Sequence, residues 1–352
     1  MKKQVLFALL FVFVVLVSAC SPRPVLKVYM PGDYINRDLV KAFEKEYQVR
    51  VRVITFESNE IAVTQIQTNS YDLVIPSDYA IEELVSKDLL LPMDYTRFTS
   101  FKTEDFDLGM LGLLDELKDE GFDLLKYAVP YFWGNVGLLY DTARVSLSYL
   151  ENQGWNALKD HSRDILIYDS SRDSFMIALN ALFGDTVSVN QPTDQELAQA
   201  ETWLMEAKGP KTRFLTDEIF DDMLHPAKHE IAVAYSGDAN YLMSLNDQLG
   251  YFVPESGTNV FVDAFAIPKS VVEIDLAYQF IDYFLSYDVA LENAIEIGYT
   301  SPLIAVINAI IEDEEYDPSS YLILVRPSDE MFRYNTALKR KIEEAWLRVR
   351  AS

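Results

Sequence analysis

Hydrophobic and polar positions over residues 25–100 follow two periods in turn, which predicts strands alternating with helices. Residues 25–30 form a short β-prone run that ends at Pro31-Gly32-Asp33. Apolar residues between 34 and 46 then fall at helical spacing among charged ones, which predicts an amphipathic helix. The run 49–56 alternates valine with arginine and predicts a second strand. A strand, a helix and a strand in this order form a βαβ unit, whose strands pair in parallel.

The same alternation continues along the chain. Further strands are predicted at 72–75, 129–140, 164–168, 230–235 and 260–267, and further helices at 60–67, 80–87, 174–183, 195–207 and 274–287. No internal repeat and no long flexible linker interrupts this order. The pattern predicts an α/β fold in which open sheets are flanked by helices.

Residues 1–19 carry the three parts of an export signal. Lys2 and Lys3 precede an unbroken apolar run at 5–17, and Ser18-Ala19 supplies a small-residue cleavage site. Thirteen apolar residues are too few for a spanning helix, which needs about 20. We therefore expect 1–19 to be removed on export.

The residue after this signal is Cys20, the only cysteine in the chain. The sequence Val17-Ser18-Ala19-Cys20 resembles the lipobox of bacterial lipoproteins, in which the cysteine is acylated and becomes the new N-terminus. Residues 20–24 would then form a lipidated cysteine and a short tether. The resemblance implies a protein outside the cytoplasm, held at a membrane by acyl chains.

The charge of the chain excludes several partners. Its 352 residues carry 55 acidic and 30 basic side chains, a formal net charge of −25. A charge of this sign repels phosphate, which argues against nucleic-acid binding and favours cationic ligands. A mean hydropathy near zero indicates a globular chain, and its length favours two domains.

Motifs for phosphate binding and covalent catalysis are missing from the sequence. It contains no glycine-rich phosphate loop and no Gly-x-Ser-x-Gly, and no nucleophile stands at a supporting distance from a base. His225 and His229 are four residues apart, but Pro226 and Lys228 between them disfavour a metal site. The acidic run 312–315 lacks the spacing of a calcium loop. We expect no enzyme activity, no metal and no cofactor.

Aromatic and acidic residues gather instead at the predicted strand ends, where ligands of open α/β sheets collect. They are Asp33, Tyr34, Ser77, Tyr79, Asp169, Asp173, Tyr235, Phe261 and Asp263. Each residue by itself could be a turn, cap or core residue. Together they predict a pocket with aromatic walls and several carboxylates. Such a pocket matches a linear polyamine, whose ammonium groups need carboxylates and whose methylenes pack on rings.

Five motifs resemble the spermidine/putrescine-binding proteins of bacterial ABC transporters, the PotD type, over nearly all of the mature length. They occur in the family's order and are Phe56-Glu57-Ser58-Asn59-Glu60, the run Tyr71 to Tyr79, Pro130-Tyr131-Phe132-Trp133-Gly134, the run Val262 to Pro268, and Ile297-Gly298-Tyr299-Thr300-Ser301-Pro302. The resemblance implies a two-lobed periplasmic-binding-protein fold that closes on its ligand like a hinged trap. It places lobe 1 at 25–129 plus 259–308 and lobe 2 at 130–258 plus 309–352, and implies an ABC permease as partner.

The family's ligand residues carry over one at a time. Tyr34, Ser77, Tyr79, Asp263 and Tyr299 match the family's own residues, Asp33 and Asp173 replace glutamates, and Tyr235 and Phe261 replace tryptophans. Ser170 stands where the family has an aspartate, with Asp169 adjacent. Because one carboxylate is lost there, the choice between putrescine and spermidine stays open. The alternatives are a binder of another small solute, such as an amino acid or metal chelate, a hydrolase on the same scaffold, and a surface adhesin or structural lipoprotein.

Overall fold

The computed structural model describes residues 23–216, 218–224, 226–313 and 321–352. The predicted signal at 1–19 and the predicted acylation site Cys20 lie outside these residues, and so does His225 of the histidine pair. Within the described ranges, no group of three or more His, Cys, Asp or Glu side chains is placed to hold a metal ion.

The first part of the chain forms the predicted βαβ unit. Strands β1 (Val25–Pro31) and β2 (Arg50–Phe56) pair in parallel, and helix α2 (Arg37–Tyr47) connects them. The short strand β3 (Leu73–Val74) pairs in parallel with the other side of β1. Helices α3 (Asn59–Ile66) and α4 (Asp78–Ser86) precede and follow β3.

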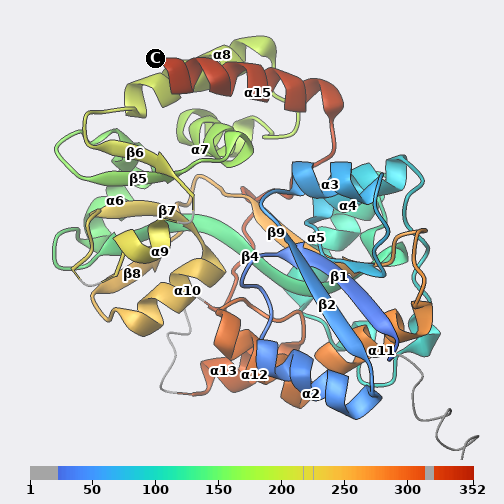
Figure 1. Ribbon diagram of the computed structural model, residues 1–352. Helices are drawn as coiled ribbons and strands as arrows, with labels where there is room; N and C mark the ends of the chain where they lie inside the picture. The colour runs from blue at the N-terminus through green and yellow to red at the C-terminus, as the bar shows by residue number, and fades with distance from the viewer. Residues whose placement is uncertain (1–22, 217, 225, 314–320) are drawn as a thin grey trace, which may run out of the picture.

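Two buried strands join the halves of the molecule. The 14 residues of β4 (Ala128–Asp141) are all buried. The first half of β4 pairs antiparallel with β9 (Val260–Ala266), and its second half pairs antiparallel with β7 (Ile231–Tyr235) and β8 (Leu249–Phe252). The strand order is β2-β1-β3-β9-β4-β7-β5-β6, so β4 runs from one group of strands into the other (Figure 1).

The second group of strands is mostly parallel. Strand β5 (Ile165–Tyr168) pairs in parallel with both β6 (Thr212–Leu215) and β7. Helices α7 (Ser171–Phe183), α8 (Asp194–Ala207) and α15 (Thr336–Ala351) pack together beside these strands (Figure 1). The other α-helices of the described residues are α5 (Leu108–Asp119), α6 (Leu147–Gln153), α9 (Ile219–Asp222), α10 (Ser236–Leu245), α11 (Ile274–Phe284), α12 (Tyr287–Ile297) and α13 (Ile304–Ile311).

The buried hydrophobic side chains form separate clusters. The first core takes residues from 26–133, 260–310 and 321–331. The second core takes residues from 136–233 and 332–349. A third, smaller cluster uses the alternate residues of β4 and β7 and therefore lies on the other face of that sheet. The chain therefore crosses from one core to the other at three places, which are β4, the start of β9 and the segment after Met331.

The expected lobe boundaries stay a prediction, and core membership gives them physical support near residues 134 and 259. The C-terminal segment 309–352 was expected to belong wholly to lobe 2, but its residues pack in both cores. Tyr321, Ile323 and Met331 pack in the first core, whereas Phe332 packs in the second. We therefore propose that lobe 1 extends to Met331 and that lobe 2 resumes at Phe332.

Several elements differ from their predicted form. Helix α2 begins at Arg37 rather than at 34, because the Asn36 side chain caps it by accepting from two backbone amides. The helix predicted over 274–287 is two helices that break at Leu285-Ser286. Ser236-Gly237-Asp238, which follows the strand predicted at 230–235, begins helix α10, for which no helix was predicted.

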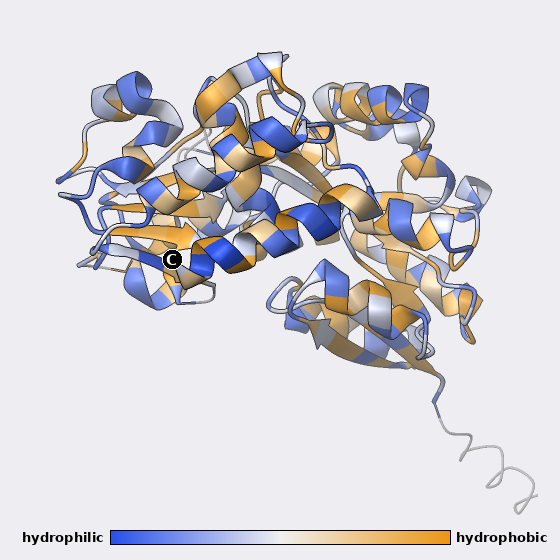
Figure 2. Ribbon diagram, turned by 90° about the horizontal axis from the view of Figure 1, so that it is seen from above, coloured by the Kyte–Doolittle hydropathy of each residue, from blue (hydrophilic) through white to orange (hydrophobic). Residues whose placement is uncertain are grey.

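Figure 2 shows helices that carry both hydrophilic and hydrophobic residues, as expected where one helix face covers a sheet. No described helix combines the length and the hydrophobicity that a membrane crossing requires.

Candidate functional site

The candidate site lies where the two cores meet. Tyr79, at the start of α4, and Tyr235, at the end of β7, each pack against both the first and the second core. Phe261 and Tyr299 belong to the first core, and Asp173 lies in the first turn of α7 beside the second. The structure thus brings together predicted residues from both expected lobes.

Asp263, in the middle of β9, is held by two hydroxyl groups. The Tyr34 hydroxyl donates to Asp263 Oδ2 at 2.5 Å, and the Ser77 hydroxyl donates to Oδ1 at 2.5 Å. Asn59 orients Ser77, because its Nδ2 donates to Ser77 Oγ and its Oδ1 accepts from the Ser77 amide. Burial raises the pKa of Asp263 to about 6, although both hydroxyl donors act to lower it. Asp263 is therefore a desolvated carboxylate without an ion-pair partner among the described residues.

The neighbouring Asp78 has a structural role at the start of α4. Its carboxylate accepts from the backbone amides of Val262 and Tyr79. Burial is the main reason that the pKa of Asp78 rises to about 7, and the nearby charge of Asp263 adds to the rise. These bonds link α4 to β9, so they hold Tyr79 and Asp263 in a fixed relation.

Asp173 is the second buried carboxylate of the site. Only 4% of its surface is exposed, and burial raises its pKa. The Tyr235 hydroxyl donates to Asp173 Oδ2 at 2.7 Å. Its other oxygen, Oδ1, is buried without a hydrogen-bond partner. A buried oxygen of this kind is costly unless a donor reaches it, which points to a ligand donor.

A third carboxylate, Asp238, was not singled out from the sequence. The Tyr299 hydroxyl donates to Asp238 Oδ1 at 2.8 Å. The Tyr299 ring lies directly on Gly237, where an added Cβ would come within 2.0 Å of it. In the sequence, Asp238 only follows closely on the strand predicted at 230–235, and nothing in that position places it beside a tyrosine 61 residues away.

Aromatic rings connect the three carboxylates. Phe261 packs edge-on against Tyr235 at 5.5 Å and against Tyr299 at 6.3 Å between ring centroids. Tyr34 packs edge-on against Tyr299 at 4.8 Å. Tyr168, which the sequence reasoning missed, packs edge-on against Tyr235 at 5.2 Å. The predicted aromatic wall is present, and tyrosines provide most of it.

Three predicted residues do not join this cluster. Asp33 is exposed, with a left-handed backbone (φ 46°), and forms no hydrogen bond or ion pair with another described residue. Asp169 turns toward α15, where it accepts from Trp346 Nε1 at 3.2 Å and pairs with Arg350 at 2.8 Å. Ser170 caps α7 by accepting from the Asp173 amide at 3.3 Å. Asp169 is thus already neutralised and does not replace the carboxylate missing at Ser170.

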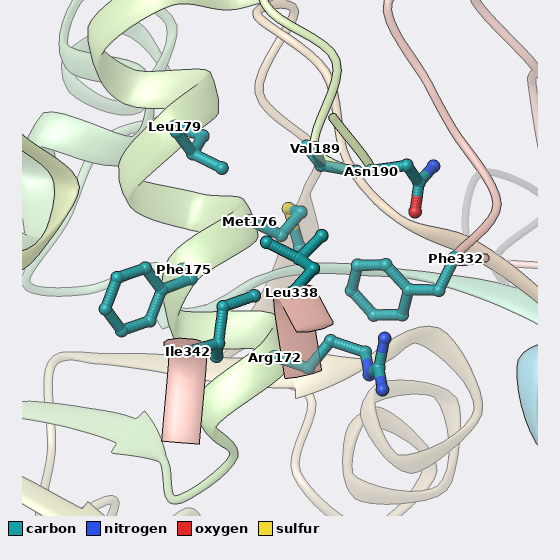
Figure 3. A pocket seen from close by; sticks show the side chains of 9 residues that line it. All are labelled: Arg172, Phe175, Met176, Leu179, Val189, Asn190, Phe332, Leu338 and Ile342. Atoms are coloured by element: carbon teal, nitrogen blue, oxygen red, sulfur yellow. The ribbon is translucent and has the colours of Figure 1, made fainter. Parts of the chain in front are cut away.

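Arg172 is a third residue that sequence reasoning missed. Its guanidinium lies 4.2 Å from the centroid of the Tyr79 ring and 5.3 Å from that of Phe332. Beside it, a small and largely apolar pocket opens between α7 and α15 (Figure 3). This pocket is lined by Arg172, Phe175, Met176, Leu179, Val189, Asn190, Phe332, Leu338 and Ile342. Its lining contains no carboxylate, so it is distinct from the cluster around Asp263 and Asp173.

Comparison with known proteins gives this arrangement a context. Residues 38–318 match the family of bacterial extracellular solute-binding proteins. The putrescine-binding periplasmic protein PotF of Escherichia coli is 26% identical over 322 residues, which cover 86% of this chain and 85% of that protein.

Solved structures agree with that match. A structure from Listeria monocytogenes described as a spermidine/putrescine ABC transporter is 30% identical, with a TM-score of 0.77, and the match covers 93% of this chain and 98% of that one. PotD from Streptococcus pneumoniae, a spermidine/putrescine ABC transporter substrate-binding protein, is 27% identical, with a TM-score of 0.74 and coverage of 93% and 99%.

Fold and family together define an extracytoplasmic solute-binding protein of an ABC transporter, and not an enzyme. The chain belongs to the bacterial extracellular solute-binding proteins and, among them, to the PotD/PotF family. The family and the α/β periplasmic-binding-protein fold that the sequence motifs implied are thereby confirmed.

Proposed function

We propose that this protein captures a linear polyamine, putrescine or spermidine, between its two lobes and delivers it to an ABC permease. One observation carries the proposal. Asp263 and Asp173 are buried in the part of the molecule where the cores meet, and neither forms an ion pair with a described basic residue. Two desolvated carboxylates separated by aromatic rings match a chain of methylenes with an ammonium group at each end.

The site geometry supports the following roles for the residues of the proposed site. Asp263, oriented by Tyr34 and Ser77, is the partner of one ammonium group. Asp173 Oδ1 accepts from the other, because this oxygen has no donor within the described protein. Tyr235, Phe261 and Tyr299 cover the methylenes between them, and Tyr79 lies at the Asp173 end beside Arg172. The names of the relatives PotF and PotD support the same ligand class.

Calorimetric titration of the purified protein tests this function. We expect saturable binding of putrescine or spermidine, and much weaker binding of lysine and arginine, because their carboxylates would face Asp263 or Asp173. If the protein binds lysine or arginine but neither putrescine nor spermidine, the polyamine proposal is wrong and the protein is an amino-acid receptor.

We also propose that Cys20 is acylated and anchors the protein. The support is the lipobox-like Val17-Ser18-Ala19-Cys20, which lies outside the described residues. Cys20→Ser should abolish incorporation of labelled palmitate and release a folded protein from the membrane, because acyl chains supply the membrane affinity. Equal labelling of the variant and the parent would contradict the anchor.

A further inference from the structure

Asp78 is a buried carboxyl group next to Asp263, and only 1% of its surface is exposed. Its two oxygens accept from the backbone amides of Tyr79 at 2.5 Å and of Val262 at 2.9 Å. Val262 directly precedes Asp263 in β9. Ser77, which directly precedes Asp78, forms a β-bridge with Asp263. The two aspartates are therefore held beside each other at the place where α4 begins on β9.

The Asp78 carboxyl group forms no ion pair with a described basic residue. The charge of Arg172 lowers the pKa of Asp78, but the ion-pair partner of Arg172 is Glu60, at 3.9 Å. Further charged side chains on the segments packed around α4 are Asp263 on β9, Asp173 on α7, Lys126 in the turn Leu124–Lys126, and Arg333 and Lys339, which pair with Glu82 and Glu83. A negative charge on Asp78 is thus only partly compensated by the protein.

Burial and the charge of Asp263 both oppose the ionisation of Asp78. Burial is the main reason that the pKa of Asp78 rises to about 7, and the charge of Asp263 raises it further. The pKa of Asp263 rises only to about 6, so Asp263 loses its proton first as the pH increases. Near neutral pH, Asp263 is mostly ionised and Asp78 is about half protonated. The ligand-free pair of aspartates therefore still holds a proton that the protein can give up.

An ammonium group beside Asp263 changes this balance. Its positive charge cancels the charge of Asp263 that opposes the ionisation of Asp78, and it attracts the Asp78 carboxylate directly. The amides of Tyr79 and Val262 already donate to the two Asp78 oxygens, so the ionised form needs no rearrangement. The ammonium group keeps its own proton, because the pKa of a primary amine is about 10. The proton that leaves is therefore the one on Asp78, and the buffer takes it up.

We propose that Asp78 releases its proton when an ammonium group pairs with Asp263, so that amine capture is coupled to proton release. This inference rests on the proposed polyamine function and adds a role for a residue that does not itself contact the amine. Asp78 acts through Asp263, by fixing the start of α4 on β9 and by changing its own charge. Amine affinity therefore continues to rise with pH over the range in which Asp78 ionises.

Calorimetric titration in two buffers of different ionisation enthalpy, MOPS and Tris, counts the protons released per bound amine. The ligand is whichever of putrescine and spermidine binds the parent more tightly. At about pH 7, the parent should release about half a proton more than Asp78→Asn, which cannot ionise. Asp329→Asn is the matched control, because Asp329 is also buried, also accepts from two backbone amides and also has a raised pKa, but lies outside the site. Asp329→Asn should release as many protons as the parent.

A second measurement needs no substitution and holds even where Asp78→Asn fails to fold. Carbon-13 NMR of the Asp78 carboxyl carbon follows its titration in the parent with and without bound amine. The midpoint should fall by at least about one pH unit when the amine binds.

The other outcomes separate this inference from the function on which it rests. Equal proton release by the parent and Asp78→Asn, or an NMR midpoint that the amine does not move, overturns the role of Asp78 while the polyamine function stands. An equal loss of proton release in Asp329→Asn overturns it as well, because the effect would then not depend on the place of Asp78 beside Asp263. If the parent binds neither amine, the polyamine function itself fails.

Discussion

At the scale of single residues, hydroxyl groups donate to each of the three carboxylates of this site. Tyr34 and Ser77 donate to Asp263, Tyr235 donates to Asp173, and Tyr299 donates to Asp238. A hydroxyl donor orients a carboxylate without cancelling its charge. The negative charge of Asp263 therefore stays available to a cationic solute, which an arginine or lysine partner would have prevented.

Asp263→Asn should weaken amine binding by at least about tenfold, because one ammonium group would lose its charged partner in a desolvated place. Asp38→Asn, on the exposed surface of α2, is the matched control and should leave the dissociation constant unchanged. Calorimetric titration measures both. Equal affinities of the parent and Asp263→Asn would remove Asp263 from the binding site.

Binding should also depend on pH through Asp263, whose pKa burial raises to about 6. Since an ammonium group needs the ionised carboxylate, amine affinity should fall as the pH drops through about 6. The stability of the ligand-free protein should move the other way. A raised carboxyl pKa destabilises the fold above that pKa, and this cost is relieved as the pH falls toward the unfolded value near 4.

Titration calorimetry and thermal unfolding between about pH 5 and 8 separate these two trends. In Asp263→Asn, amine affinity and protein stability should both depend less on pH. Part of the pH dependence of stability should remain, because the pKa of Asp78 is also raised. Amine affinity that stays constant across this range in the parent would contradict an ionised Asp263 as partner.

At the scale of elements, the start of α10 positions Tyr299. Gly237 touches the Tyr299 ring so closely that any side chain would displace it. Gly237→Ala should therefore destabilise the fold by about 1–3 kcal/mol and weaken amine binding. Gly112, in α5 with open space around it, is the matched control. Gly112→Ala should leave binding unchanged and stabilise by about 0.5–1 kcal/mol, because alanine favours a helix more than glycine does.

Thermal unfolding and amine titration of the two glycine variants measure this difference. A Gly237→Ala protein with the parent's stability and affinity would show that α10 and Tyr299 move apart without cost, contrary to the close contact between them.

At the scale of the whole molecule, ion pairs connect the two cores. Arg333, directly after the second-core residue Phe332, pairs with Glu82 of α4 at 2.8 Å and also with Glu120. Both Arg333 and Glu82 are less than one fifth exposed, so this contact is worth more than a surface ion pair. It stabilises an arrangement in which the cores lie close together.

Arg333→Gln should favour a more open ligand-free molecule and speed up amine release, because Glu82 would lose its partner. Small-angle scattering should show a larger radius of gyration, and stopped-flow measurements a faster dissociation. Arg348→Gln breaks a more exposed ion pair with Glu201, which joins α15 to α8 beside the second core alone, and is the control. The same change in radius for both variants would mean that general destabilisation, and not lobe opening, is the cause.

Local patterns in the sequence were sufficient for most of the elements and for the aromatic and acidic character of the site. The alternation of valine and arginine in 50–53 predicted β2, and the helix predicted at 195–207 is α8, which begins with a capping box of Thr193 and Glu196. Such features depend on neighbours a few residues apart. Residues far apart in the chain, such as Tyr34 and Asp263, could be grouped only because Tyr34 follows one predicted strand, Asp263 lies on another, and both match family residues.

The sequence by itself determined the α/β class, the acidic charge and which strand ends carry rings and carboxylates, because these follow from composition and short-range periodicity. Only the tertiary structure decided which of those side chains meet. Adjacent residues diverge there: Asp169 turns to Arg350, Ser170 caps a helix, and Asp173 enters the site. Arg172 and Asp238 join it through contacts with Tyr79 and Tyr299 that no local spacing encodes. The physical reason is that side-chain direction at a strand end depends on the elements packed around it, which come from distant parts of the chain.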